Sequence, residues 1–219
     1  MWTYADNVFS VDPFPCRVMV TTVSAGDMKD VARRRTFCQS RNMDFVRLTM
    51  GSQVHGAQVA VVDTKNCGQL ISETDSLITG IPGIPLGVYT ADCVPVFVAA
   101  KNGMCGGVIH AGWRGMAAGA IRAAVHTLCE QFSVASTDII AAVGPHIQSC
   151  CYTVNADVLE LFSQIGPALD LGIAAVGQLR KSGIEDIVSC GRCTHHEPDL
   201  FYSYRRNKTP ERMLSIMVL

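Results

Sequence analysis

The sequence lacks any apolar run long enough to cross a membrane. Its longest stretches, residues 85–89 and 94–100, are separated by Asp92 and fall far short of the roughly 20 residues that a membrane-spanning helix needs. The opening residues, MWTYADNVF, contain neither the basic segment nor the apolar core of a signal peptide. We therefore expect a cytoplasmic protein with no membrane partner.

An excess of charge of one sign is also missing. The 18 Lys and Arg residues nearly balance the 19 Asp and Glu residues, so the net charge is only -1. A protein that grips nucleic acid needs a strongly basic surface, and we therefore expect a small-molecule partner rather than a nucleic acid. Hydrophobic residues make up 48% of the 219 positions, a globular composition that suits one domain spanning residues 1–219.

The paired CxxC spacing of a zinc ribbon is absent. Cys190 and Cys193 form one CxxC, followed by His195, but no second CxxC completes a structural site. The adjacent Cys150 and Cys151 are poorly suited to chelating one tetrahedral ion. A chain of this size also builds its core without disulfides, so the ten cysteines are interpreted as ordinary reduced thiols.

Short apolar runs alternate with helical patterns along the chain. Strands are predicted around residues 58–63, 86–90, 94–100, 104–110, 138–143, 187–188, 200–204 and 213–219. Helices are predicted over residues 27–38, for four or five turns after Gly115, around 159–162 and over 171–179. This order predicts an α+β fold, a single layered domain of mixed β-sheet packed with helices.

Two of these strands bring chemistry together. Residues 94–100 and 104–110 are separated by a short turn and predict a hairpin whose open ends carry Cys93 and His110. A thiolate and an imidazole are ligands that Zn²⁺ prefers, and three protein ligands with one open position are typical of catalytic zinc. His55, in the Gly-flanked segment SQVHG, is the candidate third ligand, but spacing does not prove this, because a lone histidine is more often a structural residue.

The HAGWRG segment offers further candidates. Arg114 lies in a Gly-flanked turn at the start of a helix, where a guanidinium and free backbone N–H groups favour phosphate. The alternative is that Arg114 pairs with Asp92 or with a carbonyl oxygen. Asp92 is a candidate for orienting a ligand histidine or for packing into its turn. Trp113 could stack on a purine or wedge the turn.

Several motifs in this chain resemble those of the laccase-domain family, known as multicopper polyphenol oxidases or purine nucleoside phosphorylases. In chain order these motifs are QVHG, PGIPLGVYTADCVPVFVA, HAGWRG, GPHIQSCCYTV and FYSYRR. The resemblance runs from about Val20 onward. It implies a fold similar to the catalytic domain of cytotoxic necrotizing factor, and a zinc-binding active site made of His55, Cys93 and His110.

The resemblance also implies an activity. Similar family members phosphorolyse adenosine, inosine, guanosine and methylthioadenosine, with inorganic phosphate as co-substrate, and some deaminate adenosine. Copper-dependent polyphenol oxidation is the weaker alternative, because a multicopper site needs many histidines and this chain has six, with no HxH pair. Zinc is therefore preferred to copper.

A Cys93–His110 nucleophile pair is a third alternative. It would make the protein a Cys-His hydrolase, a deamidase or a peptidoglycan-editing enzyme. That alternative predicts sensitivity to thiol alkylation without a bound metal. The sequence assigns no role to His146 or Arg205, and it gives neither the preferred nucleoside nor the oligomeric state.

Overall fold

Strand β9 (Val94–Ala100) is buried on both of its faces. Val96 and Val98 belong to a hydrophobic cluster beneath helices, whereas Phe97 and Ala99 belong to a second cluster between sheets. Successive side chains of a strand point to opposite faces. A strand that is apolar throughout therefore has to lie in an inner layer, and β9 does.

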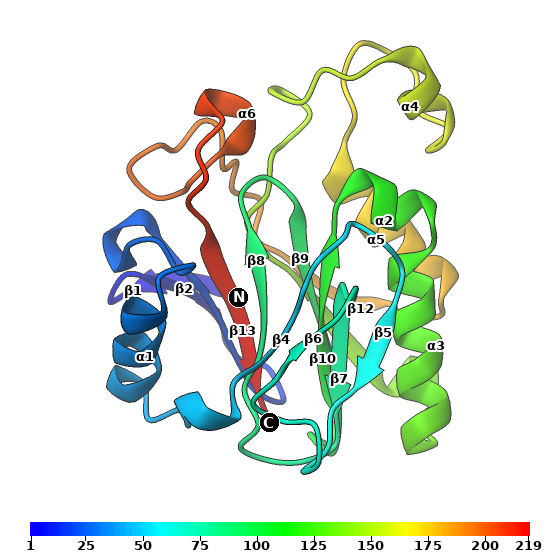
Figure 1. Ribbon diagram of the computed structural model, residues 1–219. Coiled ribbons are helices and arrows are strands. Elements are labelled where there is room, and N and C mark those ends of the chain that lie inside the picture. Colours follow the sequence, from blue (N-terminus) through cyan, green and yellow to red (C-terminus); the bar gives the residue numbers. More distant parts are fainter.

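The computed structural model describes all residues 1–219 and contains two mixed β-sheets that pack face to face (Figure 1). The first sheet has the spatial order β1 (Trp2–Ala5), β2 (Val8–Val11), β3 (Arg17–Thr21), β13 (Met213–Val218), β8 (Leu86–Thr90), β4 (Thr49–Gly51) and β6 (Leu70–Ile71). The second has the order β12 (Asp186–Ser189), β11 (Ile139–Val143), β9, β10 (Gly106–Ala111), β7 (Ser76–Thr79) and β5 (Val59–Val61). The predicted mixed sheet packed with helices is confirmed.

Helices cover the outer face of each sheet. The second sheet is covered by α2 (Trp113–Ala117), α3 (Ala120–Phe132) and α5 (Leu171–Lys181), and α1 (Val31–Ser40) packs on the first (Figure 1). The remaining helical elements are α4 (Ala156–Glu160), α6 (Tyr204–Asn207) and the 3-10 turns Val23–Ala25, Phe45–Arg47 and Ser136–Asp138. None of the helices combines the length and apolar character that crossing a membrane requires.

The hairpin that the sequence predicts is confirmed. Strands β9 and β10 are antiparallel, with His110 opposite Pro95 and Ala111 opposite Val94. Cys93, which immediately precedes β9, therefore lies beside the end of β10. This pairing brings the thiol and the imidazole to the same edge of the second sheet.

The helix after the hairpin has the predicted apolar stripe, with Ile121, Val125 and Leu128 buried. It differs from the prediction in being divided, because helical structure begins at Trp113 and is interrupted at Gly119. Gly119 has a φ of +87°, a left-handed conformation that cannot continue a right-handed helix.

The prediction of a strand over residues 200–204 is wrong. Phe201 is fully buried, as an apolar strand residue would be, but the chain there forms a loop that enters α6. The hydroxyl oxygen of Ser203 accepts a hydrogen bond from the backbone N–H of Arg206 at 3.2 Å, and serine is a favoured residue at a helix start. The short helix predicted around residues 159–162 lies slightly earlier, as α4.

Candidate active site

Three potential metal ligands meet where β9 and β10 end. Cys93 precedes β9, His110 lies within β10, and His55 projects from the loop between β4 and β5. Their ligand atoms all lie within 4.8 Å of one another. His110 is only 3% exposed, Cys93 is half-buried and His55 is exposed. We call these three residues the cleft triad; it runs from a buried floor to an accessible rim.

The glycines of HAGWRG make room for this arrangement. A Cβ atom on Gly112 would lie 2.9 Å from Cδ2 of His55 and 3.0 Å from Sγ of Cys93. A Cβ on Gly115 would lie 2.8 Å from the carbonyl oxygen of Gly56. The turn from β10 into α2 therefore passes directly beneath the His55 loop, and side chains at these two positions would separate the triad.

The buried carboxylate of Asp75 holds both His110 and the loop that carries His55. Its Oδ1 lies 2.7 Å from Nδ1 of His110, and both groups are buried. The carboxylate also accepts backbone N–H hydrogen bonds from Val54 and His55, each at 3.0 Å, and from Gly56 at 2.9 Å. One carboxylate thus fixes the ring of His110, leaves its Nε2 free to bind a metal, and anchors the loop that carries His55.

Gln53 holds the same loop from the other side. Its amide nitrogen donates to the carbonyl oxygen of Tyr89 at 2.8 Å, and its amide oxygen accepts from the Tyr89 N–H at 2.7 Å. This pair of bonds attaches the loop to β8. Sequence reasoning identified neither Gln53 nor Asp75; Gln53 lies within the SQVHG motif, but nothing local in the sequence distinguishes Asp75.

The ionisable groups of the triad favour a thiolate. Burial disfavours the charged thiol of Cys93, but the charge and hydrogen bonds of His110 and His55 outweigh it and lower its pKa to about 6. Burial likewise opposes protonation of His110, yet the Cys93 thiolate and Asp75 raise its pKa to about 9. Burial opposes ionisation of Asp75, and hydrogen bonds from His110 and two backbone N–H groups still lower its pKa. A thiolate beside imidazoles is the form that binds a cation.

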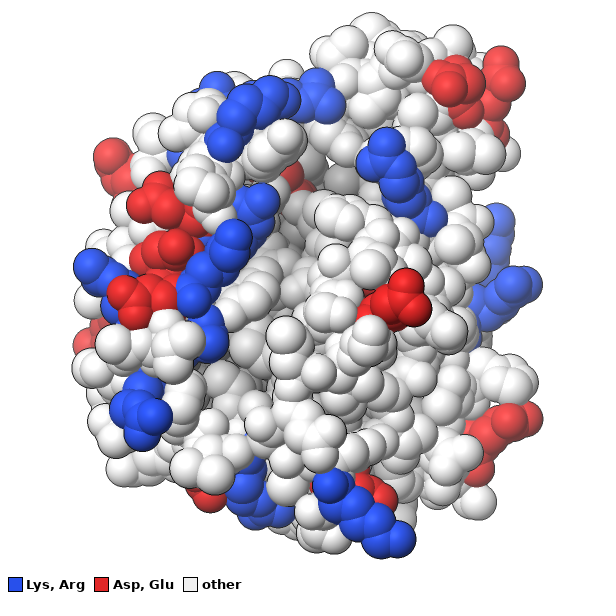
Figure 2. All heavy atoms as spheres, in the orientation of Figure 1, with Lys and Arg blue, Asp and Glu red and all other residues white.

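A cleft of about 750 Å³ opens above the triad. Its walls carry five basic side chains, Lys29, Arg114, Arg205, Lys208 and Arg212, and four aromatic ones, Tyr89, Trp113, Tyr152 and Tyr204. Blue Lys and Arg spheres gather along one side of the hollow in Figure 2, and further ones lie above it. Size, positive charge and flat apolar rings together suit a small molecule that contains an anion and a ring system.

Arg114 lies in this cleft and has no ion-pair partner. Its guanidinium lies 4.3 Å from the centre of the Trp113 ring, and no salt bridge joins it to Asp92. The carboxylate of Asp92 instead accepts from Thr194 Oγ1 at 2.7 Å and from the backbone N–H of Arg205 at 2.6 Å. The carboxylate that contacts a histidine ring is that of Asp75. Asp92 thus ties the cleft floor to the segment that carries Arg205.

Two residues without an assigned role have different locations. Arg205 lines the cleft, with its guanidinium 4.7 Å from the Tyr152 ring centre and a hydrogen bond of 2.8 Å to the carbonyl oxygen of Thr153. His146 is buried outside the cleft, and its Nδ1 lies 2.8 Å from the carbonyl oxygen of Gly144. Only Arg205 is positioned to contact a molecule bound above the triad.

Known proteins resemble the chain in sequence and in structure. A purine nucleoside phosphorylase of Streptomyces coelicolor is 34% identical over 193 residues, which cover 83% of this chain and 79% of that protein. An adenosine deaminase from an unknown prokaryotic organism is 32% identical over 197 residues, covering 79% and 75%. The crystal structure of YlmD from Geobacillus stearothermophilus superimposes with a TM-score of 0.90 at 28% identity, covering 99% of this chain and 97% of that one. A family model described as multi-copper polyphenol oxidoreductase laccase matches residues 10–219.

Proposed function

The chain belongs to this laccase family, and from that premise we propose that it is a zinc-dependent purine nucleoside phosphorylase that acts on adenosine, inosine, guanosine and methylthioadenosine. Inorganic phosphate is the co-substrate, and adenosine deamination is a second activity. The observation that carries the proposal is the cleft triad at the floor of a cleft that is both cationic and aromatic. Relatives named as purine nucleoside phosphorylases and as an adenosine deaminase support it.

The donor set of the triad fits zinc. Two imidazoles and one thiolate are borderline to soft ligands, and their close approach leaves room for one ion with one position open. His55, Cys93 and His110 would hold this ion, and Asp75 would keep His110 in the tautomer that binds it. A zinc ion held there supplies Lewis acidity for polarising an oxygen atom.

Other residues of the cleft are suited to binding the phosphate and the purine. In phosphorolysis, a phosphate oxygen attacks the sugar carbon that bears the base, and the bond to the purine breaks with its electron pair going to the purine, which takes up a proton and leaves as the free base. Arg114 and Arg205 can bind that phosphate, since guanidinium groups form paired hydrogen bonds with its oxygens. Trp113 and Tyr152, which also line the cleft, offer flat faces for the purine.

Copper-dependent polyphenol oxidation is less well supported, although the family model takes its description from it. The triad provides only two imidazoles, and the other four histidines lie outside it. The triad does not gather the many histidines that several bridged copper ions need. Zinc in a single site requires nothing beyond the residues present.

A Cys-His hydrolase, deamidase or peptidoglycan-editing enzyme remains a second candidate because of one observation. The Cys93 thiol interacts with the imidazoles of His110 and His55, which lower its pKa to about 6, as expected of a nucleophilic thiol. Such an enzyme would act without metal, and alkylation of Cys93 would abolish it. The zinc enzyme instead would lose its metal when Cys93 is replaced.

The deciding experiment measures metal content together with release of adenine or hypoxanthine from nucleosides, with and without phosphate. Native protein is compared with His55→Ala and His110→Ala, and His126→Ala is the control because this exposed histidine lies on α3, outside the cleft. We expect phosphate-dependent release that both triad variants lose and the control keeps. Unchanged turnover in both variants would exclude the proposed site. Base release without phosphate would make the protein a hydrolase, and deamination alone would exclude phosphorolysis.

A further inference from the structure

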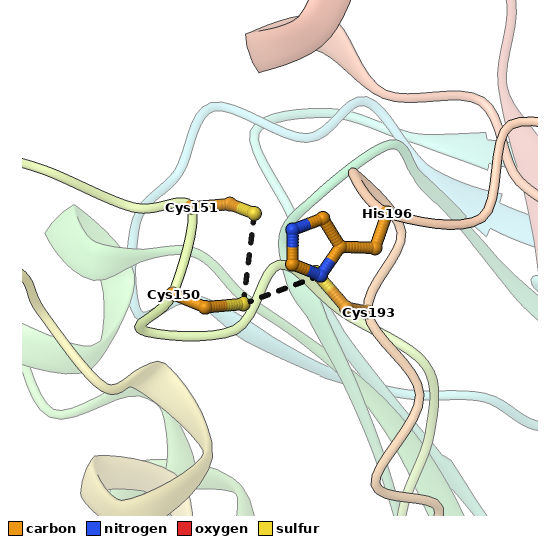
Figure 3. Close-up of side chains that lie close together, drawn as sticks. All are labelled: Cys150, Cys151, Cys193 and His196. Carbon is orange, nitrogen blue, oxygen red and sulfur yellow. Dashed lines mark hydrogen bonds between the residues drawn. The ribbon is translucent and has the colours of Figure 1, made fainter.

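A second group of potential metal ligands lies outside the cleft triad. Cys150 and Cys151 lie on the loop between β11 and α4, and Cys193 and His196 lie on the loop after β12. The two loops are 40 or more positions apart in sequence, yet all four ligand atoms lie within 4.8 Å of one another. Figure 3 shows the four side chains converging between the two loops. We call these four residues the thiol cluster.

The spacing within the thiol cluster matches a tetrahedral ion. Zinc binds sulfur at about 2.3 Å and nitrogen at about 2.0 Å, so ligand atoms on a tetrahedron are about 3.8 Å apart for two sulfurs and about 3.5 Å for sulfur and nitrogen. The sulfurs of Cys150 and Cys151 are 3.5 Å apart, and Sγ of Cys150 is 3.6 Å from Nδ1 of His196. The four side chains are therefore already close to the positions that one ion would require.

A tight turn explains how two adjacent cysteines can serve one ion. In an extended strand, neighbouring side chains point to opposite faces, which is the physical objection to Cys150 and Cys151 as joint ligands. Here the backbone N–H of Cys151 donates to the carbonyl oxygen of Gln148 at 3.0 Å, which closes a turn. Both sulfurs then lie on the side that faces Cys193 and His196, as Figure 3 shows. The objection therefore does not apply in this loop.

The surroundings of the cluster also suit a bound cation. The backbone N–H of Gln148 points at Sγ of Cys193, at 3.5 Å, and such donors stabilise a thiolate ligand. Cys193 is buried, whereas Cys150 and His196 are exposed, so an ion can enter from solvent. Cys150, Cys151 and Cys193 are all free thiols, since no disulfide forms in the chain.

We propose that the thiol cluster is a structural zinc site, separate from the cleft triad. Three thiols and one imidazole close the coordination of the ion, which is the arrangement of a structural rather than a catalytic site. The thiols release their protons to solvent as the ion binds. Cys190 and His195, the other members of the CxxC segment, do not take part.

An ion bound by the thiol cluster would stabilise the wall of the cleft that carries Tyr152 and Arg205. Cys151 directly precedes Tyr152, and Arg205 packs on that ring. Thr194, between Cys193 and His196, donates to Asp92 beside the triad. An ion shared by the two loops therefore fixes the segments that present Tyr152 and Arg205 to the cleft, whatever reaction the triad performs.

The test counts zinc in the purified full chain by mass spectrometry. Native protein is compared with His196→Ala, whose exposed ring can be removed without opening the core, and with Cys190→Ser as the matched control from the same segment. We expect one zinc for each of the two ligand groups in native protein and in Cys190→Ser, and one fewer in His196→Ala. His55→Ala should lose the other ion and keep this one, which separates the two sites.

Two further measurements identify the ligands. Cobalt(II) bound to His55→Ala should give the strong sulfur-to-metal absorption of tetrahedral thiolate coordination, and His196→Ala should weaken or shift it. Zinc should raise the melting temperature of His55→Ala by about 5 °C or more. The double variant that carries both His55→Ala and His196→Ala should show no such rise. Each of three results would overturn the proposal. His196→Ala could contain as much zinc as native protein, the cobalt spectra could lack thiolate bands, or the purified protein could contain a disulfide between Cys150 and Cys151.

Discussion

The cleft triad and the thiol cluster use the same kinds of side chain but are supported in different ways. The triad has three ligands at the ends of paired strands, with a buried carboxylate, Asp75, fixing one imidazole. The thiol cluster has four ligands on two loops, held by turns and by one backbone N–H. Strands with a carboxylate support keep a site rigid while one position stays open, which suits chemistry. The two loops also pair through a short backbone bridge between His146 and Cys193, and an ion bound by both loops would add rigidity there, which suits a structural role.

The largest loss of activity is expected when His110, the buried ligand of the triad, is replaced. His110→Ala deletes a ligand and leaves the Asp75 carboxylate buried without its imidazole partner. We expect kcat/KM for phosphorolysis to fall by about a thousandfold or more, together with loss of one zinc ion. Steady-state kinetics and metal analysis measure both effects. Turnover within about twofold of native would contradict the assignment of His110.

The next test examines the thiol of the triad without metal. Because the pKa of Cys93 is about 6 instead of the ordinary 9.0, its thiolate form, which is the reactive one, persists down to a lower pH. At neutral pH the fraction of Cys93 in the thiolate form in zinc-stripped protein should be roughly a hundredfold larger than for a thiol of ordinary pKa, and its alkylation should be faster. The rate should rise with pH and level off above a midpoint of about 6.

Mass spectrometry of the alkylated peptides makes the measurement. Cys105, whose pKa burial raises to about 11, is the internal control and should stay unmodified over the same range. Added zinc should protect Cys93. A midpoint near 9 would mean that the imidazoles do not stabilise the thiolate.

A smaller effect is expected from the support of the triad. Asp75→Asn keeps the shape of the side chain but directs an NH₂ group at backbone N–H donors of the His55 loop or at His110. We expect zinc affinity and activity to fall by about 10- to 100-fold. Competition with a chelator measures the affinity, and Asp186→Asn, an exposed residue paired with Lys101, is the control. Equal affinities in the two variants would show that Asp75 only holds the fold.

The smallest effect concerns the rim of the cleft. Arg114→Ala should raise the KM for phosphate by about tenfold, with less change in kcat, because it removes one of several basic groups. Arg122→Ala, on the exposed side of α3, is the matched control. A KM that stays the same for phosphate would assign the anion site to Arg205 or Lys208 instead.

The parts that sequence predicted well are those with local patterns. The β9–β10 hairpin and the apolar stripe of α3 depend on residues close together in the chain, and both are confirmed. The first sheet was largely missed, because strands such as β4 and β6 contain only three and two residues and carry no periodicity of their own. Tertiary pairing, rather than local preference, makes them strands.

The site shows the same division. Cys93 and His110 came together through the hairpin, whereas spacing left His55 undecided and the family resemblance supplied it. Asp75 lies 35 positions from His110, and no sequence pattern relates the two. For the thiol cluster, the sequence argument held that the adjacent Cys150 and Cys151 are poorly suited to one ion, and the turn that removes this objection is visible only in three dimensions.

The place of β13 in the first sheet has a consequence for how the chain folds as it is synthesised. Residues 213–218 leave the ribosome after every other strand, yet β13 lies between β3 and β8, with Ser215 opposite both Val20 and Val88. Until β13 arrives, β3 and β8 have no partner between them and expose unpaired edges. The nascent chain therefore carries two open strand edges for most of its synthesis, the period in which it is most vulnerable to pairing with another copy.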